Sequence, residues 1–517
     1  MDRNRSILLD SVVFRVGLLA ALRSRKLNGQ TIGVMITASH NPPEDNGVKL
    51  VDPMGEMLEE SWEAYGTTLA NAPSEEKLFE VYDSIIKECH INPDTKANVI
   101  FARDTRSSGA HLVSILIEAL TATDTAYTDY KLLTTPQLHY ITRCLNTKGS
   151  PYEYGEPTEQ GYYEKTASSL KLAMQGRQFS GSVTVDCANG VGGPKLRELI
   201  KYLPPPSEGG LEIKVVNDDV LKPERLNHQC GADFVKTNQR APPSSHAAPM
   251  TRCASLDGDA DRIVYYFNDV DGTFRLLDGD RIATLAASFI GDLARSAGLG
   301  EKLKVGVVQT AYANGASTAY VTQDLRLPVV CTATGVKHLH HAATKFDVGV
   351  YFEANGHGTV VFSDLALKRL KKYEPQSPAQ SSALDTLRAL TALINQTVGD
   401  ALSDLLLVEV ILAHKGWGPK EWDLTYTDLP NRLVRVEVAD RYIFKAVDAE
   451  RRLESPPGVQ AQIDAAVGKF KNGRSFARAS GTEDAVRVYA EAASRSETED
   501  LAQKVAAIVR QARGEIG

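Results

Sequence analysis

Thr-Ala-Ser-His-Asn-Pro-Pro-Glu-Asp-Asn-Gly, residues 37–47, is the stretch on which the interpretation of the whole chain depends. The apolar run 32–36 before it predicts a buried strand, and the Pro42-Pro43 pair prevents the strand from continuing or a helix from following at once. The sequence therefore predicts that Ser39 is held where a strand ends and a polar loop begins. Taken alone, the stretch also fits an ordinary capped turn, because Ser, Asn and Asp side chains in loops commonly bond to nearby backbone.

A second informative segment is Asp257-Gly-Asp-Ala-Asp-Arg262, which places three carboxylates at alternate positions. If the segment is extended, they point to one side, where like charges about 5 Å apart repel by about 3 kcal/mol per pair at an effective dielectric of about 20. A partly buried cluster then requires a cation, and hard oxygen ligands favour Mg²⁺, over which Arg262 can hold a phosphate. A solvated acidic loop without metal is the alternative. A calcium EF-hand fits poorly, because Arg262 stands where that loop needs Gly.

Two further polar loops carry groups suited to a phosphorylated sugar. Arg478-Ala-Ser-Gly-Thr-Glu-Asp484 combines a guanidinium fork, hydroxyl donors and a glycine, and Arg487 on the following strand can add a second fork. Glu353-Ala-Asn-Gly-His-Gly-Thr359 offers mixed donors and acceptors for sugar hydroxyls, and Thr334-Gly335 lies in a similar turn. Taken alone, each loop is more simply explained as a polar turn, so the functional interpretation depends on finding them together.

Short apolar runs alternate with helical patterns along the chain, which indicates repeated α/β modules. The runs 99–102, 183–185 and 305–308 each lead into a polar loop that contains glycine and then into a helix. The last module differs. Alternating residues 486–491 predict a half-buried strand, and Ser496-x-x-Glu499 predicts the capping box of a following helix with one apolar face, so a small α+β domain is expected at the C-terminus.

Bulk properties exclude several classes of protein. The chain has 517 residues, enough for three or four domains, with 43% hydrophobic and 24% charged residues. A formal charge of −7 argues against nucleic-acid binding, and we expect no membrane association because no apolar run is long enough to span a bilayer. Six cysteines without CxxC spacing and the lack of a secretory signal predict a reduced, cytoplasmic protein.

Together, and in this order, the four loops closely resemble those of the α-D-phosphohexomutase superfamily, over nearly the whole chain. The resemblance implies an α/β fold with four domains around a central cleft: three related mixed-sheet α/β domains and a smaller α+β C-terminal domain. We expect the domains to span residues 1–155 with the serine loop, 156–275 with the metal-binding loop, 276–405 with the sugar-binding loop, and 406–517 with the phosphate-binding loop.

The resemblance also implies a role for each loop. Ser39 would carry a phosphoryl group at rest, with His40 and Lys49 as candidates for moving the hydroxyl proton and Arg262 to stabilise the transferred group. Mg²⁺ would be bound by the phosphate on Ser39 and by Asp257, Asp259 and Asp261. The sugar would contact Glu353, Asn355, Gly356 and His357, with Thr334 and Gly335 closing over it. The phosphate that is not transferred would be held by Arg478, Ser480, Gly481, Thr482 and Arg487.

The implied reaction is an intramolecular phosphoryl transfer in two steps, through a sugar 1,6-bisphosphate. Asn355 stands where mutases for glucose or mannose phosphates usually carry Ser, so the resemblance points to the N-acetylglucosamine branch, which feeds UDP-N-acetylglucosamine synthesis. The bisphosphate of glucose or N-acetylglucosamine is the expected activator, a sugar phosphate the expected partner, and no obligate protein partner is expected.

Two alternatives to this reading stay open. One is a phosphoglucomutase or phosphomannomutase. The other is a non-catalytic sugar-phosphate binder, because residues 1–6 lack the Gly/Thr-rich loop with an arginine that approaches the serine in the family.

Overall fold

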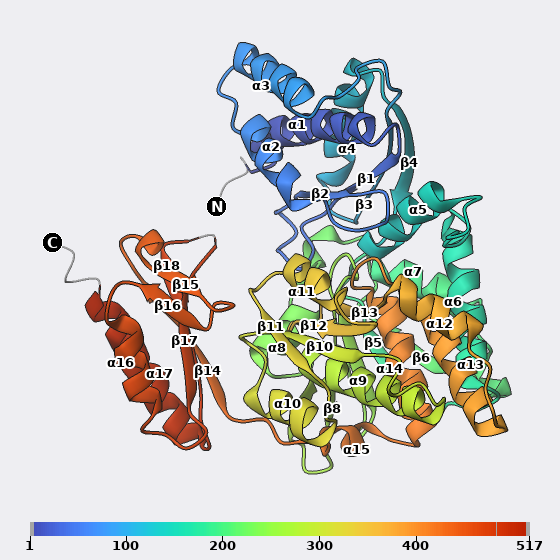
Figure 1. Cartoon of the computed structure of the whole chain (residues 1–517), viewed down its shortest axis with the longest axis vertical. Coiled ribbons are helices and arrows are strands. Elements are labelled where there is room, and N and C mark those ends of the chain that lie inside the picture. The colour runs from blue at the N-terminus through green and yellow to red at the C-terminus, as the bar shows by residue number, and fades with distance from the viewer. Residues whose placement is uncertain (1–4, 482, 513–517) are drawn as a thin grey trace. The chain divides into compact units, whose positions relative to one another are not determined.

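The protein, described here from a computed structural model over residues 5–481 and 483–512, divides into two compact units (Figure 1). The first contains the chain as far as Asp278 together with Asn355–Thr359 and Ser382–Pro419. The second contains Gly279–Ala354, Val360–Ser381 and the chain from Lys420 onward. The serine loop, the triple-aspartate loop and the turn at Asn355 therefore belong to one unit, and the Arg478 loop belongs to the other.

The first sheet of the chain has the strand order β2-β1-β3-β4, in which β1, β3 and β4 are parallel and β2 is antiparallel. The predicted strand before Ser39 is confirmed as β1, which ends at Ile36. The elements of this region are α1 Arg5–Lys26, β1 Thr31–Ile36, β2 Val48–Val51, α2 Glu60–Ala70, α3 Glu75–Glu88, β3 Asn98–Arg103, α4 Gly109–Ala122, β4 Ala126–Leu132 and α5 Thr135–Thr147.

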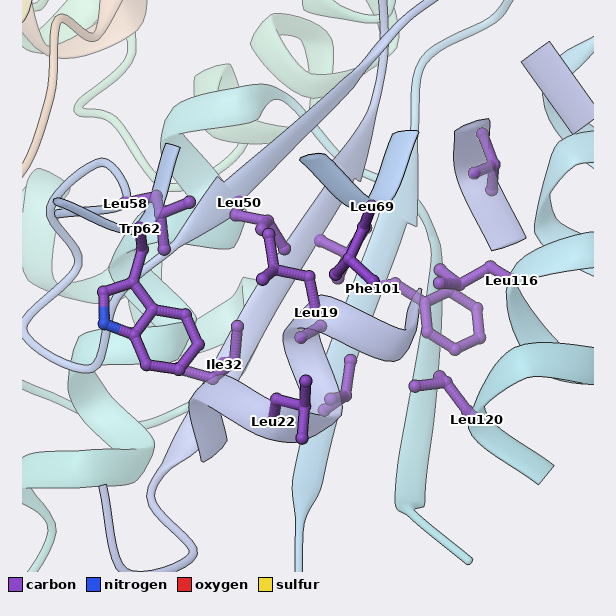
Figure 2. Packing of buried hydrophobic residues seen from close by; sticks show 14 of the residues in the cluster. Leu19, Leu22, Ile32, Leu50, Leu58, Trp62, Leu69, Phe101, Leu116 and Leu120 are labelled. Carbon is purple, nitrogen blue, oxygen red and sulfur yellow. The ribbon is translucent and has the colours of Figure 1, made fainter. Parts of the chain in front are cut away.

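An apolar cluster fixes this sheet against its helices. Leu19 and Leu22 of α1 lie among Ile32 of β1, Phe101 of β3 and Leu116 of α4, all of them buried (Figure 2). Each fully buried side chain of this kind contributes about 1.5–3 kcal/mol relative to exposure. The cluster therefore anchors β1, and with it the point at which the serine loop leaves the sheet.

The second sheet has the order β6-β5-β7-β8-β9, with β5, β6 and β7 parallel and β8 and β9 antiparallel. The triple-aspartate loop connects the antiparallel neighbours β7 and β8. The elements are α6 Glu159–Met174, β5 Ser182–Asp186, α7 Gly192–Ile200, β6 Glu212–Val216, α8 Ala232–Asn238, β7 Arg252–Leu256, β8 Ile263–Asn268, β9 Phe274–Leu277 and, later in the chain, α14 Ala401–Lys415.

The third sheet has the order β11-β10-β12-β13, with β10 parallel to both β11 and β12. The predicted turn at residues 353–357 lies between β12 and β13, as expected. The elements of this region are α9 Gly279–Ser296, β10 Val305–Thr310, α10 Gly315–Ala319, β11 Val329–Thr332, α11 Val336–Ala343, β12 Val348–Phe352, β13 Gly358–Phe362, α12 Asp364–Lys372, α13 Pro378–Leu393 and α15 Pro419–Asp423.

The C-terminal region is an antiparallel sheet of order β14-β18-β17 with α16 and α17 together on one side of it (Figure 1). The predicted strand is confirmed as β18, but the predicted cap is wrong. Helix α17 begins at Arg495, and the Oγ of Ser494 accepts from the Glu497 amide, so the capping pair lies two residues earlier than Ser496. The elements are β14 Asn431–Glu437, β15 Lys445–Val447, β16 Arg452–Ser455, α16 Val459–Val467, β17 Arg474–Ala479, β18 Ala485–Glu491 and α17 Arg495–Ala512.

Three mixed sheets with helices and a smaller α+β region confirm the predicted fold class. The domain limits at residues 155, 275 and 405 stay a prediction. Among the residues that the structure describes, no helix combines the length and apolarity needed to cross a membrane.

Candidate active site

Ser39 lies three residues beyond the end of β1, with its backbone in the left-handed region at φ 54°. Its Oγ is 2.8 Å from a carboxylate oxygen of Asp257, 2.8 Å from one of Asp259 and 3.3 Å from one of Asp261. The hydroxyl has one proton, so it can donate only one of these three hydrogen bonds. The serine and the three aspartates predicted from distant segments are therefore brought together, in a cage with more acceptors than protons.

The three carboxylates converge because their segment turns, and not because it is extended. Asp257 Oδ1 accepts from the backbone amides of Asp261 and Arg262, at 3.1 and 3.2 Å, and Ala260 adopts φ 58°. Oxygen atoms of the three aspartates lie within 4.8 Å of one another, and all three residues are buried. At this separation each pair of charges repels by about 3 kcal/mol at an effective dielectric of about 20.

Two cations partly neutralise this cluster. Lys49 Nζ donates to Asp259 Oδ2 at 2.9 Å and to Asp261 Oδ2 at 3.0 Å. Arg262 Nε lies 3.8 Å from carboxylate oxygens of both Asp257 and Asp261. Burial lowers the pKa of Lys49, but the two aspartates outweigh it, so the net shift is upward and the ammonium stays charged.

The aspartates respond to this environment in opposite directions. Burial, followed by the charges of Asp261 and Asp259, raises the pKa of Asp257 well above its usual value. Burial also disfavours the charged form of Asp261, but Lys49 and His357 outweigh it and hold its pKa well below the usual range.

The donor set fits a divalent cation. A buried cage of three carboxylates and one hydroxyl offers only hard oxygen ligands, as Mg²⁺ prefers. The Ser39 hydroxyl has more acceptors around it than protons to donate, and the pKa of Asp257 is raised. An added positive charge would stabilise the carboxylates in their charged form and so counter both effects. Asp257, Asp259 and Asp261 are the one group of three or more such ligands that converges in the described part of the chain.

The serine loop is clamped by residues that sequence reasoning did not single out. Arg106 is buried and donates to the backbone carbonyls of Ser39, Asn41, Pro42 and Asp45, the first at 2.8 Å. A signal was available in the sequence, because the segment that contains Arg106 follows β3. The carboxyl ends of the parallel strands β1 and β3 meet at the same edge of the sheet, so their loops are neighbours.

Asp104, Asn227 and Thr135 complete the support. Asp104 accepts from Thr37 Oγ1 and from Arg106 Nε, and the Ser39 amide donates to Thr37 Oγ1. Asn227 Nδ2 donates to the Ser39 carbonyl at 2.9 Å. Thr135 Oγ1 donates to Asp259 Oδ2 at 2.6 Å. These are single polar residues in unrelated segments, and no spacing pattern marks them.

His40 follows Ser39 directly in the chain, and its role in proton transfer stays a prediction. Its Nδ1 is buried and has no hydrogen-bond partner among the residues that the structure describes. Burial and the charge of Arg262 lower the pKa of the imidazole. Both effects favour the neutral form of the imidazole.

The turn at 355–357 is joined to the triple-aspartate loop within the first unit. Arg262 forms an isolated β-bridge with His357, and His357 Nδ1 lies 3.3 Å from Asp261 Oδ1. Gly356 is required here, because at φ 89° a Cβ would stand 1.9 Å from the carbonyl oxygen of Ile263. Asn355 Oδ1 accepts from the His357 amide at 3.0 Å and so also stabilises its own turn.

The remaining predicted residues lie in the second unit, where Glu450 links two of them. Thr334 donates to Glu450 through its amide at 2.9 Å and its hydroxyl at 2.5 Å, and Arg478 Nη1 donates to the same carboxylate at 2.7 Å. The Gly335 amide donates to Glu353 Oε1 at 3.3 Å.

The rest of the predicted phosphate-binding set lies around the turn between β17 and β18. The Ser480 amide donates to the Ala485 carbonyl, and none of the described atoms lies within 4 Å of the place that a Cβ at Gly481 would take. Arg487 Nη2 donates to Glu483 at 2.6 Å. Thr482, also predicted here, lies outside the described residues.

Comparison with known families agrees with the fold. The profile of phosphoglucomutase/phosphomannomutase, alpha/beta/alpha domain I, matches residues 18–65 and 74–152, and that of the C-terminal domain matches residues 433–508. These two matches, together with the three mixed sheets and the smaller α+β region, place the chain among the phosphohexomutases.

The two central regions narrow the assignment. Residues 157–264 and 278–417 match phosphoacetylglucosamine mutase AMG1, domains II and III. Phosphoacetylglucosamine mutase 2 of Schizosaccharomyces pombe is 50% identical over 96% of this chain and 91% of its own length. The chain belongs to the phosphoacetylglucosamine mutase family.

Two solved structures support the same family assignment. The N-acetylphosphoglucosamine mutase of Aspergillus fumigatus, in complex with GlcNAc-6P and magnesium, is 69% identical over 98% of this chain and 94% of its own, with a TM-score of 0.96. A serine-to-alanine form of that protein, in complex with glucose 1,6-bisphosphate, has a TM-score of 0.94 over the same shares of the two chains, again at 69% identity.

Proposed function

We propose that this protein is a phosphoacetylglucosamine mutase, which interconverts N-acetylglucosamine 6-phosphate and N-acetylglucosamine 1-phosphate through a phosphorylated Ser39 and a 1,6-bisphosphate. The observation that carries the proposal is the placement of the Ser39 hydroxyl 2.8 Å from both Asp257 and Asp259, with Lys49 on the same carboxylate cluster. Family membership supports it.

The residues of the first unit would perform the transfer. Phosphoryl transfer asks the protein for in-line positioning and for neutralisation of charge on the transferred group. Arg106 and Asn227 hold the backbone of Ser39, while Arg262 and Lys49 supply positive charge beside it. His40 would accept the proton of the attacking sugar hydroxyl and pass it to the leaving Ser39 Oγ, and in the return transfer it would move the Ser39 proton to the leaving sugar oxygen.

Mg²⁺ is the cation that we propose for the aspartate cage. Asp257, Asp259, Asp261 and the phosphate on Ser39 would hold it, and it would withdraw charge from the phosphoryl oxygens. The magnesium complex of the Aspergillus fumigatus relative supports this choice of metal, and its complex with glucose 1,6-bisphosphate supports a bisphosphate as intermediate and activator.

Substrate contacts are divided by type of group. We assign the sugar hydroxyls to Glu353 and Asn355, with Thr334, Gly335, Gly356 and His357 shaping the turns around them. We assign the phosphate that is not transferred to Arg478, Ser480, Gly481, Thr482 and Arg487. Guanidinium forks and backbone amides are the donors that phosphate oxygens prefer.

We place the reaction in the cytoplasm, where its product would supply UDP-N-acetylglucosamine synthesis. A sugar phosphate is the partner required, and the proposal includes no nucleic acid, membrane or obligate protein partner.

Comparing rates on the 6-phosphates of N-acetylglucosamine, glucose and mannose tests the substrate assignment. We expect the highest kcat/KM with N-acetylglucosamine 6-phosphate, and an Asn355→Ser variant should lose more of that activity than of the activity on glucose 6-phosphate. Preference for glucose or mannose phosphate in the unmodified protein would favour the neighbouring mutases instead. No turnover of any of the three, with sugar phosphate still bound, would favour a non-catalytic binder.

A further inference from the structure

The carboxylate of Glu450 forms an ion pair with Arg478, the arginine that begins the proposed phosphate-binding loop. Glu450 Oε1 accepts from Arg478 Nη1 at 2.7 Å. The Nε of the same guanidinium donates to the Tyr312 hydroxyl at 3.1 Å. Both charged side chains are only 21% exposed, so their charges are little screened. A carboxylate therefore stands where the proposed function requires a phosphate oxygen.

The second oxygen of the same carboxylate holds Thr334. Oε2 accepts from the Thr334 amide at 2.9 Å and from its hydroxyl at 2.5 Å. One side chain thus joins the turn that we assign to the sugar and the loop that we assign to the phosphate, all within the second unit.

The hairpin between β15 and β16 is shaped to present this carboxylate. Asp448, Ala449 and Glu450 are three successive residues in the left-handed region, at φ 53°, 55° and 65°. Residues other than glycine adopt this conformation at a cost, and it persists where surrounding contacts determine it. The bonds from Thr334 and Arg478 are such contacts.

We propose that Glu450 is a displaceable internal anion that competes with the substrate's phosphate for Arg478. This inference rests on the proposed function. A phosphate oxygen that takes the bond from Arg478 Nη1 replaces the carboxylate there, and the repulsion between the two anions favours the departure of the carboxylate. Displacement also frees the amide and hydroxyl of Thr334. Occupation of the phosphate loop would in this way release the sugar-binding turn, and the protein would discriminate against anions that cannot displace Glu450.

Glu483 makes a similar contact but is a weaker candidate. It bridges Arg487 and Arg435 at 2.6 and 2.7 Å, with its side chain 33% exposed and Arg435 43% exposed. Solvent screens this pair more, and it contacts none of the residues assigned to the sugar.

Binding of inorganic phosphate to the full chain in EDTA, measured by titration calorimetry, tests the competition without turnover. Glu450→Gln keeps the size and the acceptor but removes the charge, and it should bind phosphate about tenfold more tightly than the unmodified protein. Glu454→Gln removes an equal charge from an exposed position on the same hairpin and should change the affinity less than about twofold.

Arg478→Met makes the test specific, because the gain from Glu450→Gln should disappear in the Glu450→Gln, Arg478→Met double variant. Unchanged or weaker phosphate binding by Glu450→Gln would overturn the inference. So would an equal gain from Glu454→Gln, or a gain that survives the loss of Arg478. If the protein turned over no sugar phosphate but Glu450→Gln bound phosphate more tightly, the proposed function would fail and the competition between Glu450 and phosphate would stand. If the protein turned over sugar phosphate but Glu450→Gln did not bind phosphate more tightly, the proposed function would stand and the competition would fail.

Discussion

At the scale of single residues, Arg106 is a main support of the loop that carries Ser39, the proposed nucleophile. It donates to four carbonyl oxygens of one loop and is itself oriented by Asp104, while Asn227 bonds the same Ser39 carbonyl. The left-handed backbone of Ser39 is held by these bonds. Arg106 is a positioning residue, since it reaches the backbone of the loop and not the reacting atoms.

Replacing Arg106 with Lys should lower kcat about tenfold to a hundredfold and change KM much less. An ammonium cannot reproduce the planar fork, and a shift of the nucleophile by about 1 Å costs about a hundredfold in rate. Steady-state kinetics on N-acetylglucosamine 6-phosphate is the measurement. Arg25→Lys is the matched control, because Arg25 also donates to backbone carbonyls, but to those of Thr95 and Thr123, which lie outside the serine loop. An unchanged kcat for Arg106→Lys would contradict the positioning role that we assign to Arg106.

His139 carries a pH dependence of stability. It is buried, its Nδ1 bonds the Gly55 carbonyl at 2.7 Å, and burial lowers its pKa from 6.5 to about 4. Between these values the unfolded chain binds the proton and the folded chain does not, so stability is complete above pH 6.5 and falls as the pH drops toward 4. Over this range the loss is about 3 kcal/mol.

The check is urea unfolding at pH 6.5 and pH 4. His139→Gln, which does not titrate in this range, should lose about 3 kcal/mol less than the unmodified protein over this interval. His111→Gln, at an exposed histidine, should behave like the unmodified protein. An identical pH dependence in His139→Gln would contradict the prediction.

The sequence pointed to the residues that we propose to react, but not to the residues that support them. Ser39, Asp257 and Lys49 are marked by the chemistry that their residue types allow within recognisable loops. Asn227 and Thr135 reach the site only through the chain's long-range topology, and neither residue type nor spacing distinguishes them from ordinary loop residues.

At the scale of elements, the triple-aspartate turn depends on its neighbour, the turn at Gly356. The Ile263 amide donates to the Gly356 carbonyl at 3.1 Å, so the start of β8 is bonded to this turn. A side chain at position 356 would displace both.

Gly356→Ala should therefore cost far more stability than Gly272→Ala. Both glycines have positive φ, 89° and 82°, but a Cβ at 356 would meet Ile263 at 1.9 Å, whereas none of the described atoms lies within 4 Å of one at 272. The conformational cost alone is about 1–2 kcal/mol, so Gly272→Ala isolates it. Unfolding midpoints of the two variants measure the difference, and equal losses would show that the clash is relieved at no cost.

Element positions followed from periodicity more reliably than their ends did. The runs 32–36, 183–185 and 305–308 are all strands, because apolar segments bounded by polar loops have few alternatives in an α/β protein. The start of α17 was misplaced, since Ser494 and Ser496 are both acceptable caps and only packing decides between them. The triple-aspartate segment converges by turning, which its alternating pattern did not indicate.

At the scale of the whole molecule, the predicted site residues are divided between the two units. The first unit holds Ser39, the aspartates and the cations beside them, and the second holds Arg478 and Arg487. The fold class could be predicted because four loops occur in a recognisable order, whereas the pairing of Glu450 with Arg478 could not, since it joins segments with no shared pattern.

Mass spectrometry of the peptide that contains Ser39, after incubation with glucose 1,6-bisphosphate and Mg²⁺, tests the central claim most directly. We predict one phosphoryl group on Ser39, lost on exposure to excess N-acetylglucosamine 6-phosphate as bisphosphate forms, and neither phosphorylation nor turnover in Ser39→Ala. Turnover by a protein whose Ser39 never carries phosphate, or unchanged turnover by Ser39→Ala, would contradict it.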